Sequence, residues 1–193
     1  MHRPSIVERL AGGDRRSLGA AEAVASEVLR HNERFSELFD AMAHDDAVVR
    51  MRASDAVEKL TRARPDLLVP FRKRLIDEIG EIDQHEVRWH VAQMLARIRL
   101  DAKDRSRAIA LLERYLKDDS AIVVASAMSA IGDFCLEDHH LRRRMTPVLE
   151  RLMNSGSPAL QARGKKVLSR FASLEAKVVP LRRTSTPAPR FRK

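Results

Sequence analysis

The feature that most constrains this chain is a helical pattern of apolar residues that recurs four times. In the stretch 85–98, HEVRWHVAQMLARI, apolar residues stand at offsets 0, 4, 7, 8 and 11 from Val87, which is one face of an α-helix. The same offsets from Val49, Val123 and Leu160 also fall on apolar or small residues. These starting residues are 38, 36 and 37 positions apart. Such a period predicts a solenoid of stacked helical units.

The residues before each of these helices repeat as well. Eleven positions before the starting residues stand Leu38, Ile76, Leu112 and Leu149, and seven positions before them stand Met42, Gly80, Leu116 and Met153. Each unit is therefore predicted to be a first helix, a short turn and a second helix. The predicted pairs are 33–43 with 46–62, 66–80 with 84–99, 104–117 with 120–136, and 140–154 with 157–172. The helix-capping residues expected in the turns are Asp45-Asp46, Asp83, Asp118-Asp119 and Ser155/Ser157.

Two stretches, VVRMRASDAV (48–57) and EVRWHVAQML (86–95), carry a resemblance to the HEAT-repeat family. The pairs Val49-Arg50 and Val87-Arg88 match the start of that family's second helix, and Pro70 and Pro147 match its first-helix proline. The third unit has Val123-Val124 in place of the Val-Arg pair, and the fourth has Leu160-Gln161. The resemblance covers about residues 33–172. It implies a scaffold that binds a protein partner along a concave face lined by second helices.

The predicted fold class is all-α, a right-handed α-α superhelix of about four helical hairpins with an N-terminal capping helix near 17–31. Residues 1–16 are predicted to be a flexible lead-in, 17–176 the repeat domain, and 177–193 a disordered basic tail that contains prolines. The net charge of +9 lies mostly outside the repeats, because 17–176 hold 26 basic and 25 acidic residues. The tail cations, which could act as an electrostatic tether, are Lys177, Arg182, Arg183, Arg190, Arg192 and Lys193.

The cellular compartment is inferred from what the sequence lacks. Cys135 is the single cysteine, which excludes an internal disulfide framework and favours a reducing compartment. We see no secretory signal at the N-terminus and no apolar run of membrane-spanning length. The expectation is a cytoplasmic protein.

Two histidine-containing stretches raise the question of a metal site. HEVRWH resembles the HExxH zinc helix with one residue too many, so His85 and His90 stand about 140° apart around a helix and cannot share an ion. We expect His85 in the turn and His90 on the helix surface. The other stretch, CLEDHH, has suitable ligand types at Cys135, Asp138, His139 and His140, but no second ligand group stands at a fixed spacing from it. We predict no metal and no cofactor.

Nucleophile elbows, glycine-rich phosphate loops and kinase-type motifs are absent from the sequence, so we predict no catalytic residue. A polar stripe at offsets 3, 6 and 10 of the second helices is the candidate binding surface. Trp89, at offset 2, is a candidate anchor, although a stacked neighbouring unit could equally cover it. With Trp89, the partner-binding candidates are Arg52, Lys59, His90, Gln93, Arg97, Arg163, Lys166 and Arg170.

Two further functions use similar solenoids. DNA-alkylation-repair glycosylases combine a helical solenoid with a basic groove, several aromatic residues and a catalytic acid, whereas position 93 here is Gln. Nucleic-acid binding, through such a groove or through the basic tail, remains the alternative to a protein-binding scaffold. HEAT-like lyases that attach bilin pigments are a third reading, and no residue here marks a pigment site.

Overall fold

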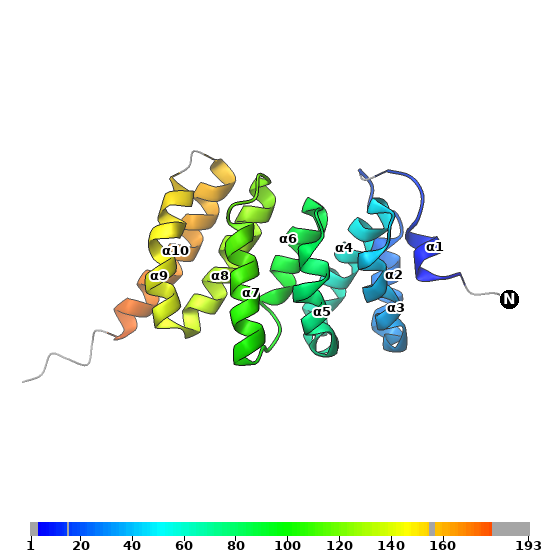
Figure 1. Cartoon of the computed structure of the whole chain (residues 1–193), viewed down its shortest axis with the longest axis horizontal. Coiled ribbons are helices and arrows are strands. Elements are labelled where there is room, and N and C mark those ends of the chain that lie inside the picture. The colour runs from blue at the N-terminus through cyan, green and yellow to red at the C-terminus, as the bar shows by residue number, and fades with distance from the viewer. Residues whose placement is uncertain (1–3, 15, 155–156, 179–193) are drawn as a thin grey trace, which may run out of the picture.

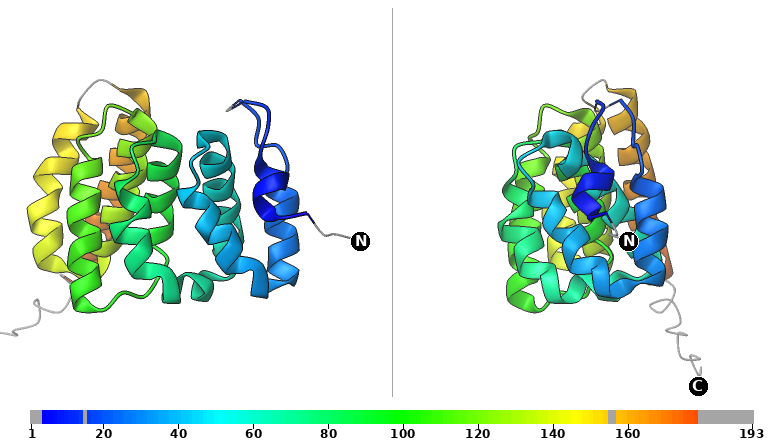
Figure 2. Two further views of the ribbon diagram at one scale, coloured as in Figure 1. Left: turned by 45° about the vertical axis from the view of Figure 1, so that its right-hand side comes forward. Right: turned by 90° about the vertical axis from the view of Figure 1, so that its right-hand side faces the viewer.

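The computed structural model describes residues 4–14, 16–154 and 157–178, and its helices stack side by side in two layers (Figures 1 and 2). One layer holds the second helices, each packed against the next: α2 (Ala21–Arg30), α4 (Ala47–Ala63), α6 (His85–Leu95), α8 (Ala121–Glu137) and α10 (Pro158–Val178). The other layer holds the first helices: α1 (Ile6–Leu10), α3 (Phe35–Asp40), α5 (Arg72–Asp77), α7 (Ala102–Tyr115) and α9 (His139–Met153). The described residues contain no strand.

The predicted all-α solenoid of four hairpins is confirmed, and α2 caps it near the predicted position. The first helices of the first two units differ from the prediction because 3₁₀ segments interrupt them: η1 (Asn32–Arg34) and η2 (Ala41–Ala43) flank α3, and η3 (Pro65–Phe71) and η4 (Ile79–Glu81) flank α5. Pro70, inside η3, lacks the backbone N–H that a regular α-helix requires at that position.

The core lies between the two layers and uses the residues that the period selected. All five register positions of α4, from Val49 to Leu60, are at most 3% exposed, and Val87, Val91, Met94 and Leu95 are fully buried. The first-helix positions Leu38, Ile76, Leu112 and Leu149 are buried as well. The apolar spacing therefore identified the residues that hold successive units together.

The arginine of each Val-Arg pair ties neighbouring turns together. Arg50 donates to the carbonyls of His44 and Asp45 in its own turn and to Gln84 Oε1 in the next, at 2.8–2.9 Å. Arg88 contacts its own turn through the Ile82 carbonyl and the next turn through Asp118, at 2.6 Å. One side chain thus bonds two consecutive repeats, which gives a physical reason for an arginine at this position.

The predicted capping residues are only partly right. Asp46 caps α4 by accepting a hydrogen bond from the Val48 N–H at 2.7 Å. Asp83 does not cap α6, because it pairs with Arg88 and Gln84 takes the cap position. Asp118 likewise precedes the cap of α8, Ser120, and accepts from its N–H at 2.8 Å. Of the fourth turn, residues 155–156 lie outside the described residues, and Ser157 directly precedes α10.

The prediction of a flexible lead-in is wrong for residues 5–12. Ser5 and Glu8 form a capping box that starts α1, and Ile6 and Leu10 of that helix are fully buried. The loop that follows α1 folds over Arg52, whose guanidinium donates to the carbonyls of Leu10, Gly12 and Ser17 at 2.6–3.0 Å. The repeat domain therefore begins near residue 5 and not at residue 17.

At the other end, α10 continues to Val178 and includes Lys177. The remaining tail cations, Arg182, Arg183, Arg190, Arg192 and Lys193, lie outside the described residues. No helix in the described ranges is both long and apolar enough to cross a membrane.

Candidate functional site

A hollow of about 300 Å³ lies across the second-helix layer, and four consecutive second helices contribute to it. We call it the second-helix hollow. Six of its lining residues come from α6 and α8, in the middle of the array, and Ala96 and Arg97 directly follow α6. Its lining is Glu58, Arg62, Ala92, Gln93, Ala96, Arg97, Ser126, Ser129, Ala130, Asp133 and Arg163. Three predicted site residues, Gln93, Arg97 and Arg163, therefore share one surface.

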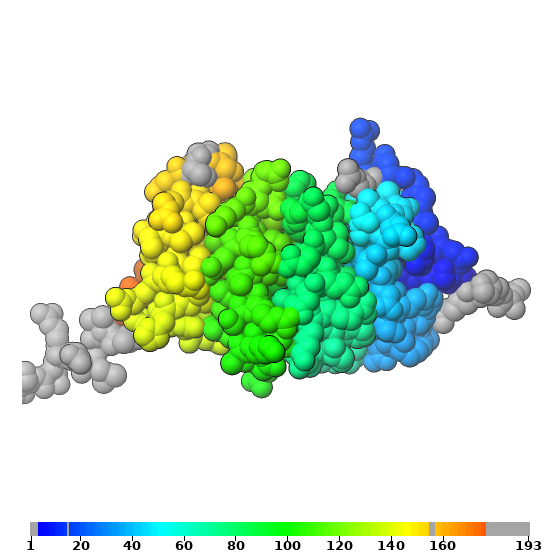
Figure 3. Space-filling model, viewed as in Figure 1, coloured from blue at the N-terminus to red at the C-terminus, as the bar shows by residue number. Residues whose placement is uncertain are grey.

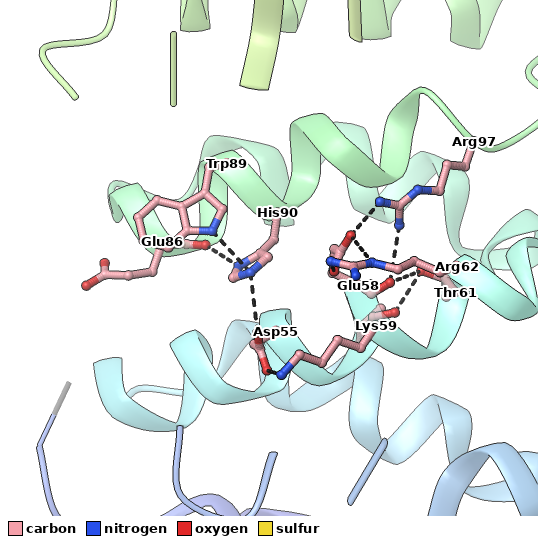
Figure 4. A network of polar contacts seen from close by, with 10 residues as sticks. Asp55, Glu58, Lys59, Thr61, Arg62, Glu86, Trp89, His90 and Arg97 are labelled. Carbon is pink, nitrogen blue, oxygen red and sulfur yellow. Dashed lines mark hydrogen bonds and ion pairs between the residues drawn. The ribbon is translucent and has the colours of Figure 1, made fainter. Parts of the chain in front are cut away.

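The α4 edge of the hollow is a network around Glu58 (Figure 4). The side chain of Glu58 is 1% exposed and accepts two hydrogen bonds from Arg62, at 2.8 and 3.0 Å, and a further one from Arg97. Burial alone would raise the pKa of the Glu58 carboxyl, but the hydrogen bonds and charges of the two arginines outweigh it and lower the pKa. The pair between Glu58 and Arg97 connects α4 to the turn that follows α6, and Glu58 sets the direction of both guanidinium groups.

The cations around the hollow differ in how far solvent can reach them. The side chain of Arg62 is 62% exposed, whereas that of Arg97 is 29% exposed. Arg170 of α10 pairs with Asp133 of α8 at 2.7 Å, and Lys166 is exposed on α10 outside the lining. Lys59 pairs with Asp55 at 3.0 Å on its own helix. The site residues predicted from the sequence thus include Lys59, Lys166 and Arg170 at the edges of the hollow. They do not include Glu58 and Arg62, which line it.

Two predicted site residues are buried in the solenoid and are unsuited to contact a partner. Arg52 is 4% exposed and bonds the loop after α1, and His90 is 7% exposed, which corrects its expected place on the helix surface. Both stand at offset 3, and Ser126 at the same offset is also buried, whereas Arg163 at this offset of α10 is partly exposed. Arg52 and His90 satisfy their hydrogen bonds within the solenoid.

His90 is held as a neutral imidazole. Its Nδ1 lies 2.7 Å from the Glu86 carbonyl, and its Nε2 accepts a hydrogen bond from Trp89 Nε1 at 3.1 Å (Figure 4). This pattern assigns the single proton to Nδ1. Burial is the main cause that lowers the pKa of His90. Trp89, half-buried against the core, therefore orients a histidine on its own helix and does not line the second-helix hollow.

The possible metal ligands that lie close together in the structure differ from those that the sequence suggested. His85 begins α6, and its ring lies 3.3 Å from Asp118 and 3.7 Å from Asp119, so these three residues bring possible ligand atoms together. Asp118, however, already pairs with the Arg88 guanidinium at 2.6 Å and accepts from the Ser120 N–H. The Asp118 carboxylate is thus already occupied by contacts within the turn. We assign His85, Asp118 and Asp119 a structural role in holding α6 and α8 together.

The residues of CLEDHH serve separate structural roles. Cys135 is buried, which raises the pKa of its thiol to about 11 and disfavours the thiolate that metals bind. Asp138 caps α9 by accepting from the Leu141 N–H at 2.9 Å, and it also pairs with Arg105. The rings of His139 and His140 meet edge-to-face on the exposed first turn of α9.

The second-helix hollow combines two arginines held by Glu58, and Arg163, with the neutral side chains of Gln93, Ser126 and Ser129. Such a surface offers charge and hydrogen-bond donors to a ligand, and arginine guanidinium groups match carboxylates in shape and charge. Sequence reasoning missed Glu58 and Arg62 because they lie at offsets 9 and 13. Their spacing of four residues, which favours an ion pair on one helix, was the available signal.

A family model described as a HEAT repeat domain matches residues 8–171, which is most of the chain and includes the C-terminal part of α1. No curated protein matches the sequence. The matched range begins within α1, in agreement with the packing of that helix into the core.

Proposed function

Because this chain belongs to the HEAT-repeat family, we propose that it is a non-enzymatic scaffold that binds an acidic segment of a protein partner in its second-helix hollow. HEAT repeats form helical scaffolds that often take part in protein interactions. The observation that carries the proposal is the hollow itself, because α4, α6, α8 and α10 all contribute to one surface. A segment lying across it would contact residues more than 100 positions apart in sequence, from Glu58 to Arg163.

The charge of the hollow supports an acidic segment. Arg62, Arg97 and Arg163 line it, against the two acids Glu58 and Asp133. Glu58 is buried and saturated by its two arginines, so it repels an incoming carboxylate less than an exposed acid would. Arg62 has most of its surface free to solvent and is the best placed cation for a first contact.

The test is affinity capture from the native host lysate, with the full chain as bait and with nuclease-treated samples in parallel. The hollow variant is Arg163→Glu combined with Lys166→Glu, because neither residue forms an ion pair within the described part of the chain. Lys103→Glu is the matched control, since Lys103 is exposed on α7 in the other layer. We expect a discrete protein that survives nuclease treatment, is lost with the hollow variant and is retained with the control.

Two results would contradict the proposal. If everything that binds disappears after nuclease treatment, the chain is a nucleic-acid binder. If a captured protein is retained equally by the hollow variant and the control, the second-helix hollow is not its binding site. Thermal unfolding of both variants near the wild-type temperature would show that the charge reversals leave the solenoid folded.

A further inference from the structure

In the first-helix layer, two neighbouring contacts between successive first helices, which we call seams, differ in how closely the helices pack. In the seam between α5 and α7, the Tyr115 hydroxyl donates to the Gly80 carbonyl at 2.6 Å, and a side chain on Gly80 would overlap Leu111. Between α7 and α9, by contrast, two adjoining hollows share Ala110, Glu113 and Arg144 and together form one groove. We call it the outer groove. It lies on the face shown in Figure 3, between α7 in green and α9 in yellow.

The groove runs along both helices. Ile109 of α7 and Leu116, the C-cap of that helix, contribute to the floor of the groove. The floor residues of α9, which recur at intervals of three or four positions, are Leu141, Met145, Val148 and Leu152. This spacing places the α9 residues on one face of that helix. At 1.5 Å per residue, the 14 residues of α7 extend for about 21 Å. A partner helix of three to four turns, about 14 residues, would match that length.

The repeat itself shows that the α9 face is incompletely covered. With the 37-residue step between the third and fourth units, Leu111 corresponds to Val148 and Tyr115 corresponds to Leu152. Leu111 is 1% exposed and Tyr115 is 4% exposed, because α5 and η4 cover them. Val148 and Leu152 are only half-buried, although they occupy the same places in their unit. The outer groove therefore leaves open a surface that the preceding unit closes.

A single position explains the difference in closure. Gly80 and Leu116 occupy the same place, seven residues before Val87 and Val123. A Cβ atom on Gly80 would lie 2.5 Å from Leu111 Cδ2 and 3.1 Å from the Leu75 carbonyl oxygen, so a larger residue would have to displace the Leu111 side chain and crowd the backbone of α5. Leu116 brings a full side chain to the α7–α9 seam, where it lines the groove. The larger side chain accounts for the wider separation of these two helices.

The edge of the groove is basic. Its charged lining residues near the C-terminal half of α7 are Arg114, Lys117, Arg144 and Arg151, against the single acid Glu113. Arg144 pairs with Glu113 at 2.6 Å, and Arg114 pairs with Glu81 of the preceding unit. Lys117 and Arg151 have no ion pair among the described residues, and they flank the floor residues Val148 and Leu152.

We propose that the outer groove binds an amphipathic helix of a protein partner whose polar flanks are acidic. The apolar floor would take leucine-like side chains at helical spacing, and Lys117 and Arg151 would pair with acids beside them. Ala110, small and exposed, lets a partner backbone approach α7 closely. This surface lies on the opposite layer from the second-helix hollow, and the proposal does not depend on the function assigned to that hollow.

The test uses two synthetic amphipathic peptides of about 18 residues, with leucines at helical spacing and either Glu or Lys at every flanking position. Fluorescence anisotropy of each labelled peptide is measured against the full chain. We expect the Glu peptide to bind at least about tenfold more tightly than its Lys twin. In Lys117→Glu with Arg151→Glu, the preference should reverse. In Val148→Glu, both peptides should weaken, by about tenfold or more for the Glu peptide.

Val69→Glu is the matched control, because Val69 is an apolar residue 38% exposed in the same layer and outside the groove. It should leave peptide binding unchanged. Should Val148→Glu unfold the chain, the charge-reversal variant still decides, since Lys117 and Arg151 are exposed. The proposal is overturned if the Glu and Lys peptides bind with equal affinity, if neither peptide binds, or if the charge-reversal variant still prefers the Glu peptide. Sedimentation showing a dimer that Val148→Glu abolishes would assign the groove to a second copy instead.

Discussion

The α5–α7 and α7–α9 seams connect the same kind of helix in successive repeats, yet one is closed and the other is open. At the closed seam, Gly80 permits close contact with Leu111, and the buried Tyr115 hydroxyl bonds the Gly80 carbonyl. At the open seam, Leu116 replaces the glycine and a groove separates the helices. A regular period therefore fixes which elements are neighbours, while side-chain volume at single positions decides how closely they meet.

The largest expected effect comes from truncating equivalent residues in the two seams. Leu111→Ala removes a side chain that is 1% exposed and should lower the free energy of unfolding by about 3 kcal/mol. Val148→Ala, at the same place one repeat later, should cost less than about 1 kcal/mol because the groove already leaves the side chain half-exposed. Urea unfolding followed by circular dichroism measures both. Equal losses would show that the two seams are packed alike.

A second pair of substitutions adds volume to each seam. Gly80→Ala places a methyl group against Leu111 and the Leu75 carbonyl, and we expect a loss of about 2 kcal/mol in unfolding free energy. Ala110→Leu adds a larger side chain to the open groove and should change stability by less than about 0.5 kcal/mol. If Gly80→Ala is tolerated while Ala110→Leu destabilises the chain, the glycine does not account for the closure of its seam.

The sequence predicted the stacking and the core well, because both depend on apolar spacing that the chain displays directly. Val87 and its equivalents were identified by that spacing, and they are buried. The period also predicted that Gly80 and Leu116 are equivalent. The period did not show that this one difference opens a groove. How closely two first helices pack depends also on the volume of the side chains that the adjacent unit contributes.

The candidate site was predicted only in part for a related reason. Arg52 and His90 stand on a polar stripe, but the exposure of a polar residue depends on what covers it from other elements. The loop after α1 folds over Arg52, and α4 lies beside His90. Gln93, Arg97 and Arg163 stand on positions that no neighbouring unit covers fully, so the same reasoning placed them correctly in one hollow.

A third prediction uses the one tyrosine of the chain to probe the closed seam. Burial raises the pKa of Tyr115 above its ordinary value of 10.0, so the folded state retains the phenol proton at a pH where the unfolded state loses it. The contribution of the buried, protonated Tyr115 to the free energy of unfolding is complete below pH 10 and is lost as the pH rises beyond it. At pH 11 the loss should reach about 1.4 kcal/mol.

The measurement compares urea unfolding of the wild type and Tyr115→Phe between pH 9 and pH 11. The variant lacks the titrating group and should lose less stability over this interval, although it starts about 1 kcal/mol lower because the hydrogen bond to Gly80 is absent. Ultraviolet absorbance reports ionisation of this tyrosine without interference from another. A phenol that titrates near pH 10 in the folded chain would mean that the closed seam admits water.

The smallest expected effect concerns the ion pair that crosses the open seam. Arg144 and Glu113 are 2.6 Å apart, but their side chains are 58% and 33% exposed, so water and salt screen the attraction. Arg144→Gln should therefore lower the unfolding free energy by less than about 0.5 kcal/mol, and 0.5 M salt should remove most of the difference. A loss above about 1 kcal/mol that persists in salt would show that this pair holds α9 against α7. The outer groove would then be a seam closed by charge, and a partner helix would have to break that contact to enter.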